Sequence, residues 1–300
     1  MIIKAKTLQG LPPISCKPKV PKAVAAFADW LCLERGLSPR TSENYTRAVS
    51  VLLQQVNDNP SALLVEHVRA YIRRRRFEGV KCVSVNQDLA AFRTFHRYLV
   101  LNGYAVANFV SGVCNLKFAK SLPQFIEADK IEAALASLPL TSWKQRRTHL
   151  TLLLLWVTGV RISELVSLRL SDLENGAIRV HGKGKKERLI PISAYTEKAI
   201  RALHDVAPVS SEFILFQQTG APVLLYQVRI MLRRALAGFV SPALARPHII
   251  RHSFATALMN SGARLEALRL LLGHEYIDTT TIYESVSLSA LHHEYDKCFG

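Results

Sequence analysis

The sequence has no hydrophobic run long enough to cross a membrane. Its longest apolar stretch runs over the eight residues from Leu150 to Val157, whereas a spanning helix needs about 20. The first residues hold no apolar stretch of signal-peptide length. We therefore expect a cytoplasmic protein without membrane insertion.

Cysteine is scarce, with five scattered residues and no CxxC spacing. This excludes a disulfide framework and a cysteine-based zinc site as organising features. His248 and His252 have an HxxxH spacing, but no glutamate follows the first histidine, and the neighbouring Arg251 would repel a metal cation. We expect no metal and no cofactor.

Acidic residues are few relative to basic ones. The chain carries 39 Lys and Arg against 23 Asp and Glu, a net charge of +16, while 49% of its residues are hydrophobic. This composition provides enough apolar side chains for one or two cores. A charge excess of this size on a folded chain predicts a polyanionic partner, and nucleic acid fits best.

The basic excess is uneven along the chain. Residues 1–118 hold 17 basic and 7 acidic side chains, while residues 119–300 hold 22 and 16. The first part shows only helical patterns, which we expect at about 24–31, 38–56, 63–77 and 84–102. In the last of these, Ser84 to Gln87 has the pattern of a capping box. A connector follows near 111–122, so we divide the chain into domains 1–115 and 116–300.

The second part mixes helices with a small antiparallel sheet. Helices are predicted at 127–138 and 144–157, and strands at 177–181 and 187–192. The tip between the strands is Gly-Lys-Gly-Lys-Lys, residues 182–186, which is rich in both glycine and positive charge. Helical patterns dominate the remainder, so the chain as a whole is mainly α.

Four segments carry residues suited to phosphate chemistry. They are Thr158-Gly-Val-Arg161-Ile-Ser-Glu164-Leu, Gly182-Lys183-Gly-Lys-Lys-Glu-Arg, His248-Ile-Ile-Arg251-His252-Ser-Phe-Ala-Thr, and Leu272-Gly-His274 followed after eight residues by Tyr283. On a helix, His248, Arg251 and His252 share one face because they are spaced i, i+3 and i+4. Each segment alone also fits a solvated helix end or a half-buried side chain. Their occurrence in this order along one chain is stronger evidence for phosphate chemistry than any single segment.

In this order the chain resembles the tyrosine recombinases of the phage-integrase family, and among them the two-domain Xer type. Residues 38–45 and 86–99 resemble helices of the family's core-binding domain. The resemblance implies an N-terminal all-α SAM-like core-binding domain and a C-terminal mixed α+β catalytic domain. It also implies a DNA strand transferase that needs neither metal nor ATP, acting in the cytoplasm at the nucleoid.

The groups themselves suggest a division of roles. Arg161 and Arg251 can each donate two hydrogen bonds to the non-bridging oxygens of a phosphodiester, and His248 and His274 can add further donors. The resemblance implies that Tyr283 is the nucleophile, which forms a 3′-phosphotyrosyl bond, and that Lys183 is the general acid.

Some assignments have competitors. Lys185 and Lys186 compete with Lys183, and Tyr276 and Tyr295 compete with Tyr283. We expect Glu164 to orient Arg161 or a neighbouring histidine, and His252 to support the site without taking part in the chemistry.

The DNA contacts are predicted mainly in the first domain. The candidates are Arg73, Arg74, Arg75, Arg76, Lys81, Arg93 and Arg97, with Lys185 and Lys186 in the second domain. Such residues would mostly bind phosphates and position the duplex, while few would read bases. A solvated helix end is the alternative for the four consecutive arginines.

The resemblance further implies recombination sites on duplex DNA, a homo- or hetero-tetramer working through a Holliday junction, and a second recombinase or accessory activator as partners. The Xer type suggests resolution of chromosome or plasmid dimers, and a mobile-element recombinase is the other reading. Glu275 and the tail 287–300, which lacks a His-Pro ending, depart from the Xer pattern. A type IB topoisomerase-like relaxing enzyme and a non-catalytic DNA-binding relative are the rival functions.

Overall fold

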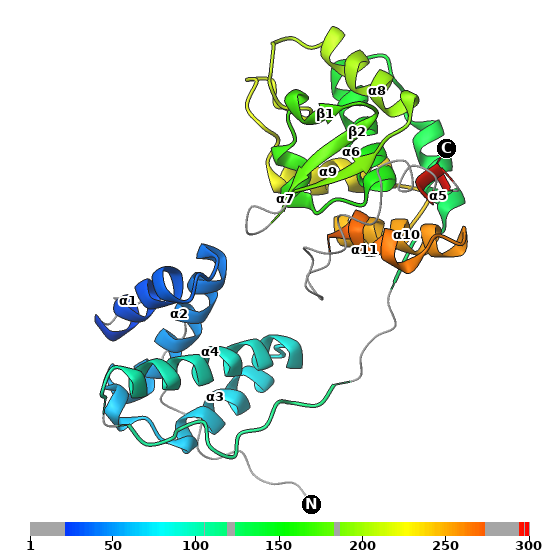
Figure 1. The fold of residues 1–300 in the computed structure, drawn as a ribbon. Coiled ribbons are helices and arrows are strands. Elements are labelled where there is room, and N and C mark those ends of the chain that lie inside the picture. The colour runs from blue at the N-terminus through cyan, green and yellow to red at the C-terminus, as the bar shows by residue number, and fades with distance from the viewer. Residues whose placement is uncertain are drawn as a thin grey trace, which may run out of the picture. The chain divides into compact units, whose positions relative to one another are not determined.

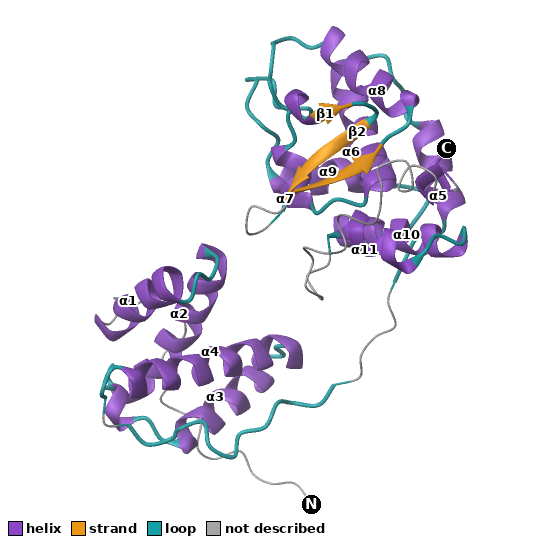
Figure 2. Ribbon diagram, in the orientation of Figure 1, coloured by secondary structure: helices purple, strands orange, loops and turns teal. Residues whose placement is uncertain are grey.

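A computed structural model describes residues 22–104, 106–118, 124–182, 187–273, 294–296 and 298–299. The chain divides into two compact units, Met1–Ser121 and Leu122–Gly300 (Figure 1). Helices make up most of both (Figure 2). The described part contains no helix long and apolar enough to span a membrane.

The N-terminal unit is built from helices alone within its described residues. They are α1 (Lys22–Asp29), a π-helical turn (Trp30–Glu34), α2 (Pro39–Leu53), two 3₁₀ turns (Gln54–Val56 and Pro60–Ala62), α3 (Val65–Phe77) and α4 (Cys82–Leu101). Their apolar faces meet in a core rich in aromatic rings, where Phe27 packs edge-on against Phe95 with ring centroids 5.0 Å apart. The core holds these helices together, because most of them are too short to be stable alone.

The starts of two helices test the local predictions in this unit. Ser38 caps α2 by accepting a hydrogen bond from the Thr41 amide at 3.2 Å, with Pro39 in the first turn as expected. The expected capping box at Ser84 is wrong. The helix already begins at Cys82, and the Ser84 amide donates to the Lys81 carbonyl at 3.0 Å, which places Ser84 inside the first turn.

The C-terminal unit combines helices with one small sheet. Its helices are α5 (Ala128–Ser137), α6 (Trp143–Thr158), α7 (Ile162–Ser167), a 3₁₀ turn (Leu170–Asp172), α8 (Ala194–Asp205), α9 (Leu225–Ala235), α10 (Pro247–Asn260) and α11 (Leu265–Leu272). The strands β1 (Leu173–Glu174), β2 (Ala177–His181) and β3 (Glu187–Pro191) form an antiparallel sheet in chain order. The predicted mainly α chain with a small antiparallel sheet is confirmed.

Strand β1 was missed by the sequence analysis because it is only two residues long. It pairs with β2 through a two-residue turn, Asn175-Gly176, in which both residues have positive φ (45° and 75°). This is the backbone that a tight hairpin with right-handed strand twist requires, and Asn-Gly is its preferred sequence. The signal for this hairpin was therefore present in the sequence.

Helix α6 lies at the centre of the C-terminal core. All of its residues from His149 to Thr158 are buried, and it contacts α5, α8, α9 and α10. A helix that is apolar on every side is stable only when it is surrounded. The helix ends at a left-handed C-cap, Gly159, two residues before Arg161.

Gly159 joins this core to the candidate site. Its φ of +57° is left-handed, and a Cβ built on it would lie 2.3 Å from Cδ1 of Phe254 in α10. Both the backbone conformation and the close approach of α10 therefore require glycine here.

We predict that Gly159→Ala lowers the free energy of unfolding of the C-terminal unit by about 2–4 kcal/mol, from left-handed strain together with overpacking. Gly238→Ala is the matched control, because Gly238 is also left-handed (φ +85°) but has nothing within 4 Å of its Cβ position. The control should lose only about 1 kcal/mol. Urea unfolding measures both, and equal losses would contradict the packing argument.

Candidate active site

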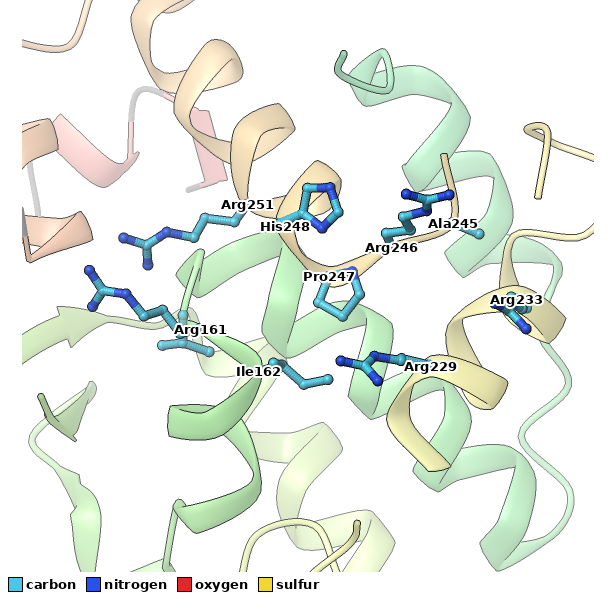
Figure 3. A pocket seen from close by; sticks show the side chains of 10 residues that line it. Arg161, Ile162, Arg229, Arg233, Ala245, Arg246, Pro247, His248 and Arg251 are labelled. Carbon is cyan, nitrogen blue, oxygen red and sulfur yellow. The ribbon is translucent and has the colours of Figure 1, made fainter. Parts of the chain in front are cut away.

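Five of the ten residues that line an open pocket of about 480 Å³ in the C-terminal unit are arginines (Figure 3). Its polar lining is Arg161, Arg229, Arg233, Arg246, His248 and Arg251. None of the ten described residues that line it is acidic. A pocket with this lining favours a negatively charged ligand, and a phosphate group is one such ligand.

Arg161 reaches this pocket from the start of α7. It occupies the N-cap position with extended backbone angles, because the chain turns sharply between α6 and α7. Its Nη1 donates to Oε1 of Glu164 at 2.9 Å, and its backbone amide donates to Oε2 at 2.8 Å. The side chain remains 45% exposed, so it is oriented from one side and open to a ligand on the other.

Arg251 reaches the same pocket from α10 and is more deeply buried. Its two terminal nitrogens donate to the carbonyl oxygens of Gly159 at 2.6 Å and Leu272 at 2.5 Å. Burial, and then the positive charges of Arg161 and Arg188, lower its pKa to about 10. An anion bound nearby would stabilise the charged guanidinium of Arg251.

His248 lies one helical turn before Arg251 on α10, and both residues line the pocket (Figure 3). Pro247 starts the helix, as expected from its fixed φ. Burial, followed by the charges of Arg246 and His252, lowers the pKa of His248 below its ordinary value. The neutral imidazole is therefore favoured at neutral pH, with one nitrogen available as a donor.

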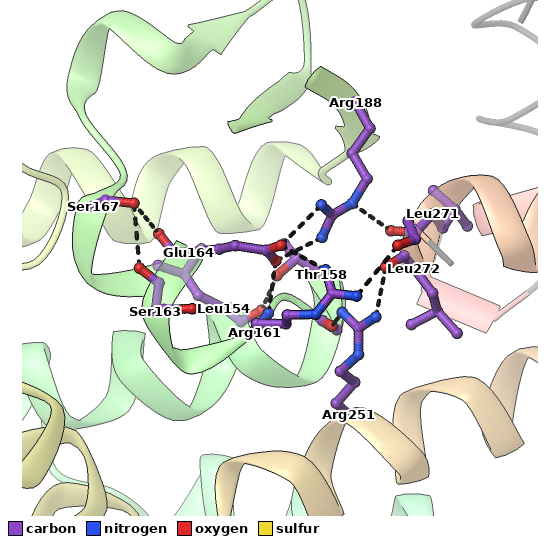
Figure 4. A network of polar contacts seen from close by, with 12 residues as sticks. Leu154, Thr158, Arg161, Ser163, Glu164, Ser167, Arg188, Arg251, Leu271 and Leu272 are labelled. Atoms are coloured by element: carbon purple, nitrogen blue, oxygen red, sulfur yellow. Dashed lines mark hydrogen bonds and ion pairs between the residues drawn. The ribbon is translucent and has the colours of Figure 1, made fainter. Parts of the chain in front are cut away.

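Glu164 is the centre of the polar network shown in Figure 4. Its side chain is only 6% exposed, and its two oxygens accept four hydrogen bonds, two from Arg161 and two from Arg188. Burial alone would raise the pKa of this carboxyl, but the hydrogen bonds and charges of Arg188 and Arg161 outweigh it and lower the pKa. The stabilisation is therefore complete above the ordinary carboxyl pKa and is lost as pH falls through the lowered value.

The structure brings together three of the predicted site residues, Arg161, His248 and Arg251, in one pocket. Glu164 lies behind Arg161 and orients it, in the arrangement that the sequence suggested. His252 is exposed on α10 and does not line the pocket. The other predicted residues of the C-terminal unit lie outside the described residues: Lys183, Lys185, Lys186, His274 and Tyr283.

Arg188 is a functional candidate that the sequence analysis missed. It lies on β3, its side chain is 6% exposed, and it pairs with Glu164 at 2.8 Å. The alternation of the strand contains the signal, because Arg188 and Ile190 fall on the same face and both are buried. An arginine on the buried face of a strand requires a buried partner.

Tyr295, a competitor for the nucleophile, is unsuited to that role in this structure. It is 1% exposed within the C-terminal core, and its ring lies 5.2 Å from that of Phe299. Burial raises the pKa of its hydroxyl above the ordinary value of a tyrosine. Both properties oppose attack by this oxygen on a DNA phosphate.

Three of the arginines predicted to bind DNA are partly buried and engaged within the N-terminal unit. Arg75 lies 3.4 Å from the buried Asp88, and Arg93 donates to the Val113 carbonyl at 2.8 Å. Arg74 pairs with Glu78 at 3.0 Å. The candidates exposed on the surface are Arg73, Arg76, Lys81 and Arg97.

We predict that sulfate stabilises the protein through this pocket. A bound anion at ten times its dissociation constant adds about 1.4 kcal/mol, which raises the melting temperature by about 3–5 °C relative to chloride of equal ionic strength. Arg251→Gln should lose more than half of this gain. Arg201→Gln on α8, where the arginine is exposed and 3.8 Å from Glu197, should keep it. Equal gains in both variants would contradict an anion site at Arg251.

The two units of the chain match two family profiles. The phage integrase family matches residues 124–289, and the phage integrase N-terminal SAM-like domain matches residues 24–103. The first match includes every residue of the pocket described above.

Relatives of known name cover nearly the whole chain. The tyrosine recombinase XerC of Azotobacter vinelandii is 33% identical over 281 residues, which is 91% of this chain and 94% of the relative. The XerC of Ralstonia pickettii is 30% identical over 302 residues, 91% of this chain and 92% of the relative.

Solved structures share the fold. A lambda integrase dimer bound to a COC′ core site aligns with a TM-score of 0.67 at 22% identity, covering 87% of this chain and 75% of that one. XerH recombinase bound to difH aligns with a TM-score of 0.61 at 19% identity, covering 87% and 81%. The resemblance inferred from four short segments is confirmed by these matches: the chain belongs to the phage integrase family of tyrosine recombinases.

Proposed function

We propose that this protein is a site-specific recombinase that cuts and rejoins duplex DNA by transesterification, in the manner of the Xer recombinases. The observation that carries the proposal is the convergence of Arg161, His248 and Arg251 on one cationic pocket. Family membership and XerC relatives that cover nine-tenths of the chain support it.

The pocket suits the phosphate at which a strand is cut. When an oxygen nucleophile attacks phosphorus, negative charge grows on the non-bridging oxygens. Arg161 and Arg251 supply fixed positive charge beside these oxygens, and the imidazole of His248 can donate one hydrogen bond to them. The cationic side chains then provide the charge stabilisation that a divalent metal provides in many other phosphoryl-transfer sites.

In this proposal the Tyr283 hydroxyl loses its proton to solvent as its oxygen attacks the phosphorus, and the phosphotyrosyl bond replaces the bond to the leaving 5′-oxygen. Lys183 gives its proton to that oxygen, and His274 adds a further donor to the phosphate. The new ester conserves the energy of the broken phosphodiester, so rejoining needs no nucleotide cofactor.

The N-terminal unit would position the duplex through exposed cations. Of the predicted contacts, Arg73, Arg76, Lys81 and Arg97 are exposed and suited to phosphates. Neighbours with this fold have been solved as a lambda integrase dimer on a core site and as a tetramer on a Holliday junction. We propose a corresponding tetramer for this chain, with duplex recombination sites as its substrate and homo- or hetero-oligomeric pairing.

Two other functions remain distinguishable by experiment. A type IB topoisomerase-like enzyme would relax supercoiled DNA without joining separate sites, and a non-catalytic relative would bind DNA without forming a covalent bond. Exchange of strands between two separate sites favours the recombinase over both.

Covalent trapping tests Tyr283 as the nucleophile. A suicide substrate, nicked close to the cleavage point, should trap a covalent adduct with the wild-type protein and none with Tyr283→Phe. Tyr295→Phe is the matched control, because the buried Tyr295 hydroxyl has no hydrogen-bond partner among the residues that the structure describes, and the phenyl ring keeps the packing. Adduct formation is read on a denaturing gel. A Tyr283→Phe adduct equal to that of wild type would overturn the assignment.

Exposed arginines of the N-terminal unit should contribute to the salt dependence of DNA binding. Replacing Arg73 and Arg97 together by alanine should lower the slope of log K against log salt by about 2, because each phosphate contact contributes about 0.9. The double variant Lys198→Ala/Arg201→Ala removes two exposed charges from α8 and serves as the control. Equal slopes for the two double variants, measured by fluorescence anisotropy, would place the phosphate contacts elsewhere.

A further inference from the structure

The end of α11 is held by three arginines from three different elements. Three consecutive carbonyl oxygens each accept one hydrogen bond: Leu271 from Arg188 at 2.8 Å, Leu272 from Arg251 at 2.5 Å, and Gly273 from Arg161 at 3.3 Å (Figure 4). The last carbonyls of a helix lack partners within the helix and carry a partial negative charge. A guanidinium group supplies both hydrogen-bond donors for these carbonyls and a positive charge beside them.

Arg188 differs from the other two arginines in its surroundings. Arg161 and Arg251 line the pocket, whereas Arg188 does not line it and its side chain is only 6% exposed. It is therefore placed to act on other protein groups and not on the phosphate.

The guanidinium of Arg188 uses all of its nitrogens within the protein. Nη1 and Nη2 donate to the two oxygens of Glu164 at 3.2 and 2.8 Å, while Nε donates to the Leu271 carbonyl. It also packs closely against the end of the helix, since a Cβ on Gly273 would lie 3.2 Å from Nη1. One side chain thus joins β3, α7 and α11 in a fixed geometry.

The two partners of Arg188, Glu164 and the end of α11, are each next to a residue of the proposed reaction. Glu164 accepts two hydrogen bonds from Arg161 and so fixes the direction of its guanidinium. On the other side, α11 ends at Leu272, Gly273 follows in a left-handed conformation, and His274 is the next residue in the sequence.

We propose that Arg188 is a positioning residue for DNA cleavage: it orients Arg161 through Glu164 and fixes the end of α11 from which the chain continues to His274. The proposal rests on the proposed function, because it gives Arg188 a purpose only if a phosphate is attacked in this pocket. A planar fork is required, since lysine has a single nitrogen and cannot bind Glu164 and Leu271 in this geometry.

The test measures single-turnover adduct formation on the nicked suicide substrate, with DNA affinity and thermal unfolding measured in parallel. Arg188→Gln should cleave about 100-fold more slowly, the cost expected from a displacement of about 1 Å in catalytic groups. Its DNA affinity should stay within a factor of about 3 of wild type, because Arg188 does not line the pocket. Arg188→Lys keeps the charge and should recover only part of the rate. If Arg188→Gln does not fold, the cleavage rate of Arg188→Lys tests the proposal in its place.

A second substrate separates positioning from a general loss of structure. Replacing the scissile phosphate with a neutral methylphosphonate removes the charge that Arg161 would bind. If Arg188 acts through Arg161, its loss should slow cleavage of the methylphosphonate much less than cleavage of the phosphate. A general structural defect would slow both equally.

Arg179→Gln is the matched control, because Arg179 lies on the neighbouring strand β2 and is 42% exposed in contact with Glu174 and Glu187. Its cleavage rate should stay within a factor of about 2 of wild type. The proposal is overturned if the folded Arg188 variants cleave at the Arg179→Gln rate, or if they lose equal factors on both substrates. Failure of the wild-type protein to form a Tyr283-dependent adduct would instead count against the proposed function.

Discussion

The C-terminal unit depends on one buried ionised carboxylate. Removing a carboxylate from water costs several kcal/mol unless its oxygens are fully paired. Glu164 meets this requirement with two hydrogen bonds from Arg188, one from the Arg161 side chain and one from the Arg161 amide. Each partner comes from a different place in the chain, so pairing this carboxylate fixes the relative positions of α7 and β3.

The arrangement of the pocket follows from this constraint. With Glu164 saturated by Arg161 and Arg188, it adds no unpaired negative charge beside the phosphate position, and the pocket lining itself contains no acidic residue. The terminal carbonyls of α11 hold three guanidiniums close together although like charges repel. The lowered pKa of Arg251 reflects that crowding together with burial. An anion in the pocket relieves part of this repulsion, so the geometry that strains the free protein favours phosphate binding.

Much of this organisation could be predicted from sequence, because local rules act on single segments. The cap at Ser38, the start of α10 at Pro247 and the apolar length of α6 all follow from spacing and residue type. The grouping of Arg161 with His248 and Arg251 came from the order of motifs in the chain and the resemblance that this order carried.

Contacts between residues far apart in the sequence could not be predicted in this way. Arg188 lies 24 residues from Glu164 and 83 residues from Leu271, and a linear pattern does not encode which buried groups meet. The same limit applies to the N-terminal unit. All four consecutive arginines were candidates for DNA contacts, yet the fold places Arg75 beside the buried Asp88 and leaves Arg73 exposed. The charge count predicted a polyanionic partner, but it could not tell which cations are paired within the fold and which are exposed on the surface.

We infer that this cationic pocket holds the phosphate that Tyr283 attacks. Mass spectrometry of the protease-digested suicide complex tests it most directly. We expect a peptide that carries a nucleotide linked through its 3′-phosphate to the oxygen of Tyr283. The same modification on Tyr276 or on another tyrosine, or a trapped complex without any phosphotyrosyl peptide, would contradict it.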